Sequence, residues 1–141
     1  MLRFRLLVSH AFQRRHGALT DLGALADSSS SEALWISANG LVVGLSENGS
    51  VDPLASGFPT LRAVLWKEGA INDLGAFAGG NTSLAYAVNS RGQVVGFAQN
   101  GISDVVSLGA FFVGLPTTTQ TRAFLWHNGA MQEAVLQLPM E

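Results

Sequence analysis

Two aspartates stand at equivalent places in a repeated tripeptide, Asp-Leu-Gly, and they are the residues of this chain best suited to chemistry. They are Asp21 and Asp73. An aspartate in this setting commonly accepts hydrogen bonds from the backbone N–H groups that follow it, which forms an Asx-turn. Its carboxylate oxygens also suit calcium, which prefers oxygen ligands. The pattern leaves two interpretations open, a structural turn and a calcium site, although no Asp-x-Asn-x-Asp-Gly calcium loop is present.

The calcium interpretation leads to one catalytic hypothesis, a small calcium-dependent hydrolase that acts on a lactone or an ester. In such an enzyme the metal and loop carboxylates polarise a carbonyl group and activate water. The candidate groups are Asp21, Asp73, Asp104, Glu32, Glu47 and His16. We keep this hypothesis as the alternative to a module that has no activity of its own.

Other chemistries find less support in the sequence. There is no cysteine, so disulfides, thiolate nucleophiles and thiolate metal sites are excluded. The histidines at 10, 16 and 127 are too dispersed for a zinc triad. The motif Gly-x-Ser-x-Gly is absent, and the glycine loop at 79–82 lacks a phosphate-binding lysine. We therefore expect no cofactor, and calcium is kept as the one alternative.

The chain repeats itself. Residues 10–49 align with residues 62–101 at a constant offset of 52, without a gap, and sixteen of these forty positions are identical. A third, partial copy over 122–141 begins with RAFLWHNGAM, which corresponds to RAVLWKEGAI in the second copy. Self-similarity at this period indicates a repeat architecture. We interpret residues 1–141 as a single repeat domain.

Each repeat contains short apolar runs that are bounded by glycine turns. In the second copy they are 64–66, 70–74, 85–88 and 93–98. The turns His16-Gly17, Glu68-Gly69 and Asn128-Gly129 favour two-residue hairpins in which the glycine has a positive φ. Closely spaced glycines leave little room for a helix. We therefore expect an all-β protein in which the four strands of one repeat form one antiparallel sheet.

The repeated motifs resemble a known family. The segments RAVLWKEGAINDLG, GQVVG and RAFLWHNG, together with His10-Ala11-Phe12, are similar to the HAF repeat, a module described as a probable extracellular repeat. The resemblance covers most of the chain, but Gln13 and Arg14 stand where the second copy has Leu65 and Trp66. It implies propeller-like β repeats in bacterial secreted or cell-surface proteins. It does not imply a catalytic activity. No export signal is visible in the first residues.

Composition limits the partners that this chain is expected to bind. Apolar residues make up 48% and charged residues only 13%, and the net charge is −2. A weakly acidic chain of this kind gives no reason to expect nucleic acid. No apolar run is long enough to span a membrane. The partners that we expect are a protein, a glycan or a small molecule, bound by a repeat module for binding or assembly.

Strand counting predicts self-association. Four-stranded units of a propeller are called blades, and the sequence accounts for about three blades, whereas closed propellers typically have ~4–8. We expect a homo-oligomer, with a dimer favoured, in which a strand at Leu2–Val8 completes a sheet with strands 122–126 and 130–136. This pairing could form between copies or within one chain. The alternative is an open three-blade monomer or a domain of a longer protein. The apolar run Val105–Val113 is interpreted as an extra strand or a contact surface.

Overall fold

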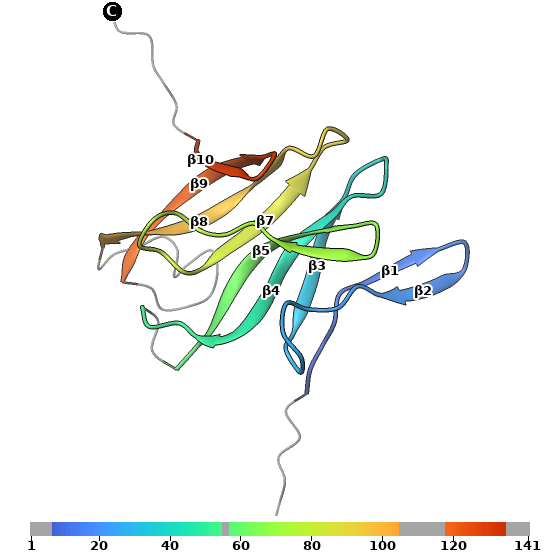
Figure 1. Ribbon diagram of the computed structural model, residues 1–141, viewed down its shortest axis with the longest axis horizontal. Coiled ribbons are helices and arrows are strands. Elements are labelled where there is room, and N and C mark those ends of the chain that lie inside the picture. Colours follow the sequence, from blue (N-terminus) through green and yellow to red (C-terminus); the bar gives the residue numbers. More distant parts are fainter. Residues whose placement is uncertain (1–6, 55–56, 105–117, 135–141) are drawn as a thin grey trace, which may run out of the picture.

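The computed structural model describes residues 7–54, 57–104 and 118–134, and in these residues the protein consists of strands and turns without a helix (Figure 1). The all-β prediction is therefore confirmed. Within this part of the chain, no helix is long and apolar enough to cross a membrane.

In the described part of the chain, ten strands form three antiparallel sheets. The N-terminal hairpin consists of β1 (Phe12–Arg15) and β2 (Ala18–Asp21). The first sheet has the order β3-β4-β5-β6, with β3 (Ser31–Ile36), β4 (Val42–Val51), β5 (Pro59–Lys67) and β6 (Ala70–Asp73). The second sheet has the order β7-β8-β9-β10, with β7 (Ser83–Val88), β8 (Val94–Ser103), β9 (Thr119–His127) and β10 (Ala130–Glu133).

The two sheets are copies of each other, pair by pair. In the first sheet Gly44 pairs with Val64, and in the second sheet Gly96 pairs with Phe124. The register of β3 on β4 shifts after Ala33, and that of β7 on β8 shifts at the equivalent place, after Ala85. The sequence offset is 52 up to β8 and 60 from β9 onward, because more residues separate β8 from β9 than separate β4 from β5.

The strands of one repeat do not share a sheet, and our expectation that they would is wrong. Each four-stranded sheet combines the last two strands of one repeat with the first two strands of the next. The reason lies in the linkers, the segments that separate one repeat from the next, of which the first is 50–61. The first linker extends β4 and β5 into a long hairpin that is still paired at Val51 and Pro59. The chain crosses between sheets at the loops that follow β2 and β6 instead.

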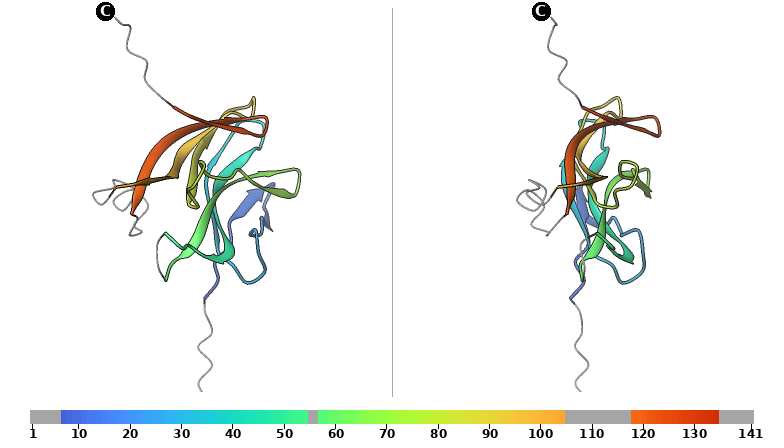
Figure 2. Two further views of the ribbon diagram at one scale, coloured as in Figure 1. Left: turned by 60° about the vertical axis from the view of Figure 1, so that its left-hand side comes forward. Right: turned by 90° about the vertical axis from the view of Figure 1, so that its left-hand side faces the viewer.

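The N-terminal hairpin, the first sheet and the second sheet follow one another across the molecule and do not close into a ring (Figure 2). The propeller arrangement implied by the resemblance is therefore not confirmed. β7 contacts β3, β4 and β5, so the two sheets pack directly on each other.

Two apolar clusters hold the three sheets together. The larger lies between the first and second sheets and contains Leu41, Val43, Ala63, Leu65, Leu74, Ala85, Val88, Val94, Ala98 and Phe124. The smaller lies on the opposite face of the first sheet, toward the N-terminal hairpin, and contains Ala11, Val42, Val64 and Trp66. Successive residues of a strand point to opposite faces. Because β4 and β5 are buried on both faces, they read as continuous apolar runs in the sequence.

The three predicted hairpin glycines have the expected backbone. Gly17, Gly69 and Gly129 have φ values of 82°, 78° and 83°, and the residue before each of them also has a positive φ. Two consecutive left-handed residues make a type I′ turn, whose twist matches that of the flanking strands.

The predicted edge strands at the two ends of the chain differ from expectation. Leu7 and Val8 belong to no strand, and the rest of the segment Leu2–Val8 lies outside the described residues. The C-terminal pair β9–β10 is not free to complete another sheet, because β9 already pairs with β8. The apolar run Val105–Val113 also lies outside the described residues.

Candidate functional site

The two Asp-Leu-Gly aspartates form Asx-turns. The Oδ1 atom of Asp21 accepts a hydrogen bond from the backbone N–H of Gly23 at 2.7 Å, and Asp73 makes the same bond to Gly75 at 2.8 Å. The structural interpretation of these residues is therefore confirmed. Calcium binding at Asp21 and Asp73 stays a prediction, and any ion there would share carboxylates that already accept hydrogen bonds.

Each of these carboxylates also lies close to a basic side chain at an equivalent sequence position, His10 in the first copy and Arg62 in the second. His10 Nδ1 lies 2.8 Å from Asp21 Oδ2, and Arg62 Nε lies 3.9 Å from Asp73 Oδ2. Arg122 and Glu133 repeat the arrangement in the third copy at 3.5 Å. The pair is a repeated structural contact, and only the first copy uses a histidine.

The surroundings of His10, the histidine in the first pair, favour its protonated form. Its hydrogen bond to the Asp21 carboxylate raises the pKa of His10, and the same bond lowers the pKa of Asp21. His10 Nε2 lies 3.1 Å from the carbonyl oxygen of Ser29, so the protonated ring donates to both groups. The contact ties the base of the N-terminal hairpin to the loop before β3.

The remaining predicted site residues lie apart from this pair. His16 occupies the left-handed turn between β1 and β2, with φ of 50°. Glu47 lies on β4, where its Oε2 atom accepts a hydrogen bond from the backbone of Ser30 at 2.8 Å. Glu32 is exposed on β3, and Asp104 follows β8. Within the described ranges, no three histidine or acidic side chains come together in a group that could hold a metal ion.

A buried carboxylate that the sequence analysis did not single out joins the two sheets. Asp52 is 1% exposed, and it accepts hydrogen bonds from the Thr82 hydroxyl at 2.7 Å, the Asn81 amide and the backbone N–H of Leu54. These partners come from the loop before β7 and the loop after β4. Asp52 is therefore a structural link, and its alignment with Asp104 is the signal in the sequence that could have drawn attention to it.

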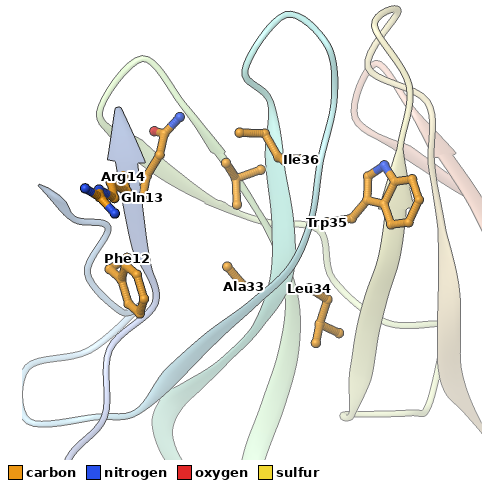
Figure 3. A pocket seen from close by; sticks show the side chains of 8 residues that line it. Phe12, Gln13, Arg14, Ala33, Leu34, Trp35 and Ile36 are labelled. Atoms are coloured by element: carbon orange, nitrogen blue, oxygen red, sulfur yellow. The ribbon is translucent and has the colours of Figure 1, made fainter. Parts of the chain in front are cut away.

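A groove of about 490 Å³ lies between β1 and β3 (Figure 3). It is lined by Phe12, Gln13, Arg14, Ala33, Leu34, Trp35, Ile36 and Val42. Three of the apolar side chains are strongly exposed: Phe12 by 64%, Trp35 by 54% and Ile36 by 52%. Sequence reasoning missed this site, although Gln13 and Arg14 mark β1 as different from its later copies.

The open edge of β1 forms one wall of the groove. Within the described residues, β1 pairs only with β2. The N–H of Leu22 donates to the carbonyl oxygen of Ala11, so the carbonyl group of Ala11 points toward the β2 side. Antiparallel pairing alternates along a strand, and the backbone N–H and C=O groups of Phe12 and Arg14 therefore point away from β2. These groups can accept a further strand.

Comparison with the models of known protein families, with curated proteins and with solved structures found no match at the threshold used. The class that the fold itself defines is an all-β protein whose described strands form three antiparallel sheets, none of them closed into a barrel. Its resemblance to the HAF repeat stays a prediction.

Proposed function

We propose that this chain is a propeller-like repeat module for binding or assembly. The observation that supports the proposal is that one sheet-on-sheet interface is complete, while its equivalents at the two ends of the molecule are uncovered. Large exposed apolar surfaces on a protein commonly mark interaction sites.

The uncovered surface at the second sheet repeats a surface that is buried on the first. Val43 and Leu65 face the second sheet and are 0% and 6% exposed. Their equivalents on the second sheet are Val95 and Leu125, which are 46% and 36% exposed. The next sheet in a row of such sheets would cover them, as the second sheet covers the first.

The uncovered surface at the N-terminal end is the groove. Val88 on β7 is 5% exposed because the first sheet covers it, whereas its equivalent Ile36 on β3 is 52% exposed. In the same way, Val64 is fully buried and its equivalent Phe12 is not. Each end of the molecule thus exposes a surface whose equivalent is buried between the sheets.

Sedimentation equilibrium at micromolar concentrations tests whether the uncovered surfaces lead to self-assembly. We expect a mass near twice the 14.8 kDa of the chain, because closed dimers are the commonest homo-oligomers. A mass that stays at 14.8 kDa as the concentration rises would contradict self-assembly. The mass should be measured with and without calcium and EDTA, so that a metal-dependent assembly is recognised.

A further inference from the structure

The groove beside β1 occupies the place that a strand fills in the next repeat. β5 is the equivalent of β1, and β4 pairs along the edge of β5 that corresponds to the open edge of β1. Gly44 pairs with Val64 and Val42 pairs with Trp66, whose equivalents are Phe12 and Arg14. These are the two β1 residues whose backbone groups point into solvent.

In the next repeat, β4 fills the position that corresponds to the groove. The side chains of β4 therefore show which side chains would fit the groove. Leu41, which precedes β4, and Val43 pack in one cluster with Ala85 and Val88 of β7 and with Val94 of β8. The equivalents of the last three are Ala33, Ile36 and Val42, and all three line the groove. The apolar floor of the groove therefore matches alternate apolar side chains on an added strand.

A sequence that would suit the added strand occurs twice in this chain. β4 and its preceding residue read Leu-Val-Val-Gly, and the matching segment before and in β8 reads Gln-Val-Val-Gly. In both sheets the glycine lies opposite a residue equivalent to Phe12, and in the second sheet that residue is also a phenylalanine, Phe124, which is 1% exposed. Phe12 would be covered in the same way by an added strand with glycine at this position.

We propose that the groove binds a β-hairpin with the pattern of β3–β4, which adds its second strand antiparallel to β1 and converts the N-terminal hairpin into a four-stranded sheet. The proposal rests on the function proposed above and names the partner of one uncovered end. A folded second copy cannot supply the hairpin, because β4 and β8 are each paired on both sides. The partner is therefore an unpaired hairpin of this repeat type, presented by another polypeptide segment.

The direct test uses a fluorescently labelled synthetic peptide of residues 29–54, which contains the β3–β4 hairpin, and the 141-residue chain. We expect saturable binding by fluorescence anisotropy. We also expect the backbone amides of Phe12 and Arg14 to become protected from hydrogen exchange, because they would donate to the added strand. The matched control peptide carries Gly44→Val. A Cβ at position 44 would lie 1.9 Å from the carbonyl oxygen of Glu32, so this peptide cannot form the hairpin and should not bind.

Variants of the chain test the geometry. Arg14→Pro removes the N–H that the added strand needs and leaves the pairing of β1 with β2 intact, because proline is tolerated where the missing N–H faces solvent. We expect at least a tenfold loss of peptide affinity. Arg14→Gln keeps the N–H and removes the charge, so it should bind. Ile36→Lys places a charge on the groove floor and should also weaken binding, whereas Ile102→Lys, at a residue 58% exposed elsewhere, should not.

Each outcome separates this proposal from the function on which it rests. Absence of peptide binding to the folded chain, or equal binding to the Arg14→Pro variant, would overturn the proposal even if the chain self-associates. Protection of the Phe12 and Arg14 amides on concentrating the chain alone would also overturn it, because a second copy would then fill the groove. Peptide binding by a chain that stays monomeric would support the hairpin site and contradict self-assembly.

Discussion

At the scale of single residues, a few backbone contacts decide which side chains the repeat tolerates. Gly44 and Gly96 lie where two strands approach closely, and a Cβ at either position would lie 1.9 Å from a carbonyl oxygen of the neighbouring strand. Both contacts lie at the shift in register that β3 and β7 share. The glycines of the Val-Val-Gly motifs therefore permit the bulge, and their role is steric.

Alanine at position 44 should cost more stability than alanine at a turn glycine. We expect Gly44→Ala to lower the free energy of unfolding by about 3 kcal/mol, because the strands must separate to admit the methyl group. Gly69→Ala, which only forces a left-handed φ onto alanine, should cost about 1 kcal/mol. Urea denaturation followed by tryptophan fluorescence measures both, and equal losses would contradict the steric role of Gly44.

The His10–Asp21 pair makes one contact of the N-terminal hairpin dependent on pH. The folded-state pKa of His10 lies above its ordinary value of 6.5. The stability that His10 contributes is therefore complete below about pH 6.5 and is lost as the pH rises through the folded-state pKa. The pKa of Asp21 is lowered from 3.8, so its contribution is present above that value and is lost as the pH falls through its folded-state pKa.

We expect the Leu22 amide, which donates to Ala11 at the base of this hairpin, to lose protection as the pH rises above about 6.5 through the folded-state pKa of His10. The cause is the loss of the proton that lets His10 donate to both Asp21 and Ser29. The His10→Arg variant copies the arginine of the second repeat and should remove this dependence. Hydrogen exchange corrected for intrinsic rates measures the effect, and the same pH profile in both proteins would show that the pair is not its source.

At the scale of elements, one repeated serine joins each hairpin to the strand that follows it. Ser83 on β7 accepts a hydrogen bond from the Ala63 N–H at 2.8 Å and donates to the carbonyl oxygen of Gly75. Ser31 on β3 makes the same two contacts, with Ala11 and Gly23. The same bridge therefore crosses between two full sheets in one case and between the N-terminal hairpin and the first sheet in the other.

The two serines should respond differently to alanine. Ser83→Ala leaves a buried N–H and a carbonyl without their partner, so we expect a loss of about 2 kcal/mol in global stability. Ser31→Ala breaks the same bonds at an open end, so it should mainly free the N-terminal hairpin and increase exchange at Ala11. Urea denaturation and hydrogen exchange distinguish these effects. A global loss from Ser31→Ala equal to that from Ser83→Ala would show that the hairpin is part of the cooperative unit.

The strands could be predicted from the sequence, but their grouping into sheets could not. Apolar runs and glycine turns are local signals, and they correctly indicated the strand at 64–66 and the turn at Gly69. Pairing depends on which connections continue as strand. The linker at 50–61 contains Pro53 and Gly57 and resembles a loop, yet its ends extend β4 and β5.

The candidate site was harder to predict for a related reason. The Asx-turns of Asp21 and Asp73 are local and followed from the Asp-Leu-Gly motif. The groove lies where the next repeat has a paired strand and the first repeat has none. It is recognised only when the exposure of Phe12 and Ile36 is compared with that of their buried equivalents, Val64 and Val88. No single sequence motif marks such a place.

At the scale of the whole molecule, the chain has two ends that differ in kind. The N-terminal end presents an unpaired strand edge beside a groove, and the C-terminal end presents the face of a complete sheet. In a closed dimer each copy presents the same surface to the other, so we expect the open faces of the two second sheets to meet. The N-terminal hairpin already occupies part of the space that a full sheet would need, so the groove accepts two strands and not four.

A charge on the open face of the second sheet should weaken self-association without unfolding the chain. Val95 is 46% exposed. A glutamate there would lose its hydration when another apolar surface covers it, and this desolvation would make association less favourable. We expect Val95→Glu to weaken association at least tenfold, about 1.4 kcal/mol, with an unchanged melting temperature of the dilute chain. Ile102→Glu, at another exposed residue outside this face, is the matched control. Sedimentation velocity over a concentration series measures the effect. An unchanged association constant for Val95→Glu would show that this face is not the one on which copies of the chain meet.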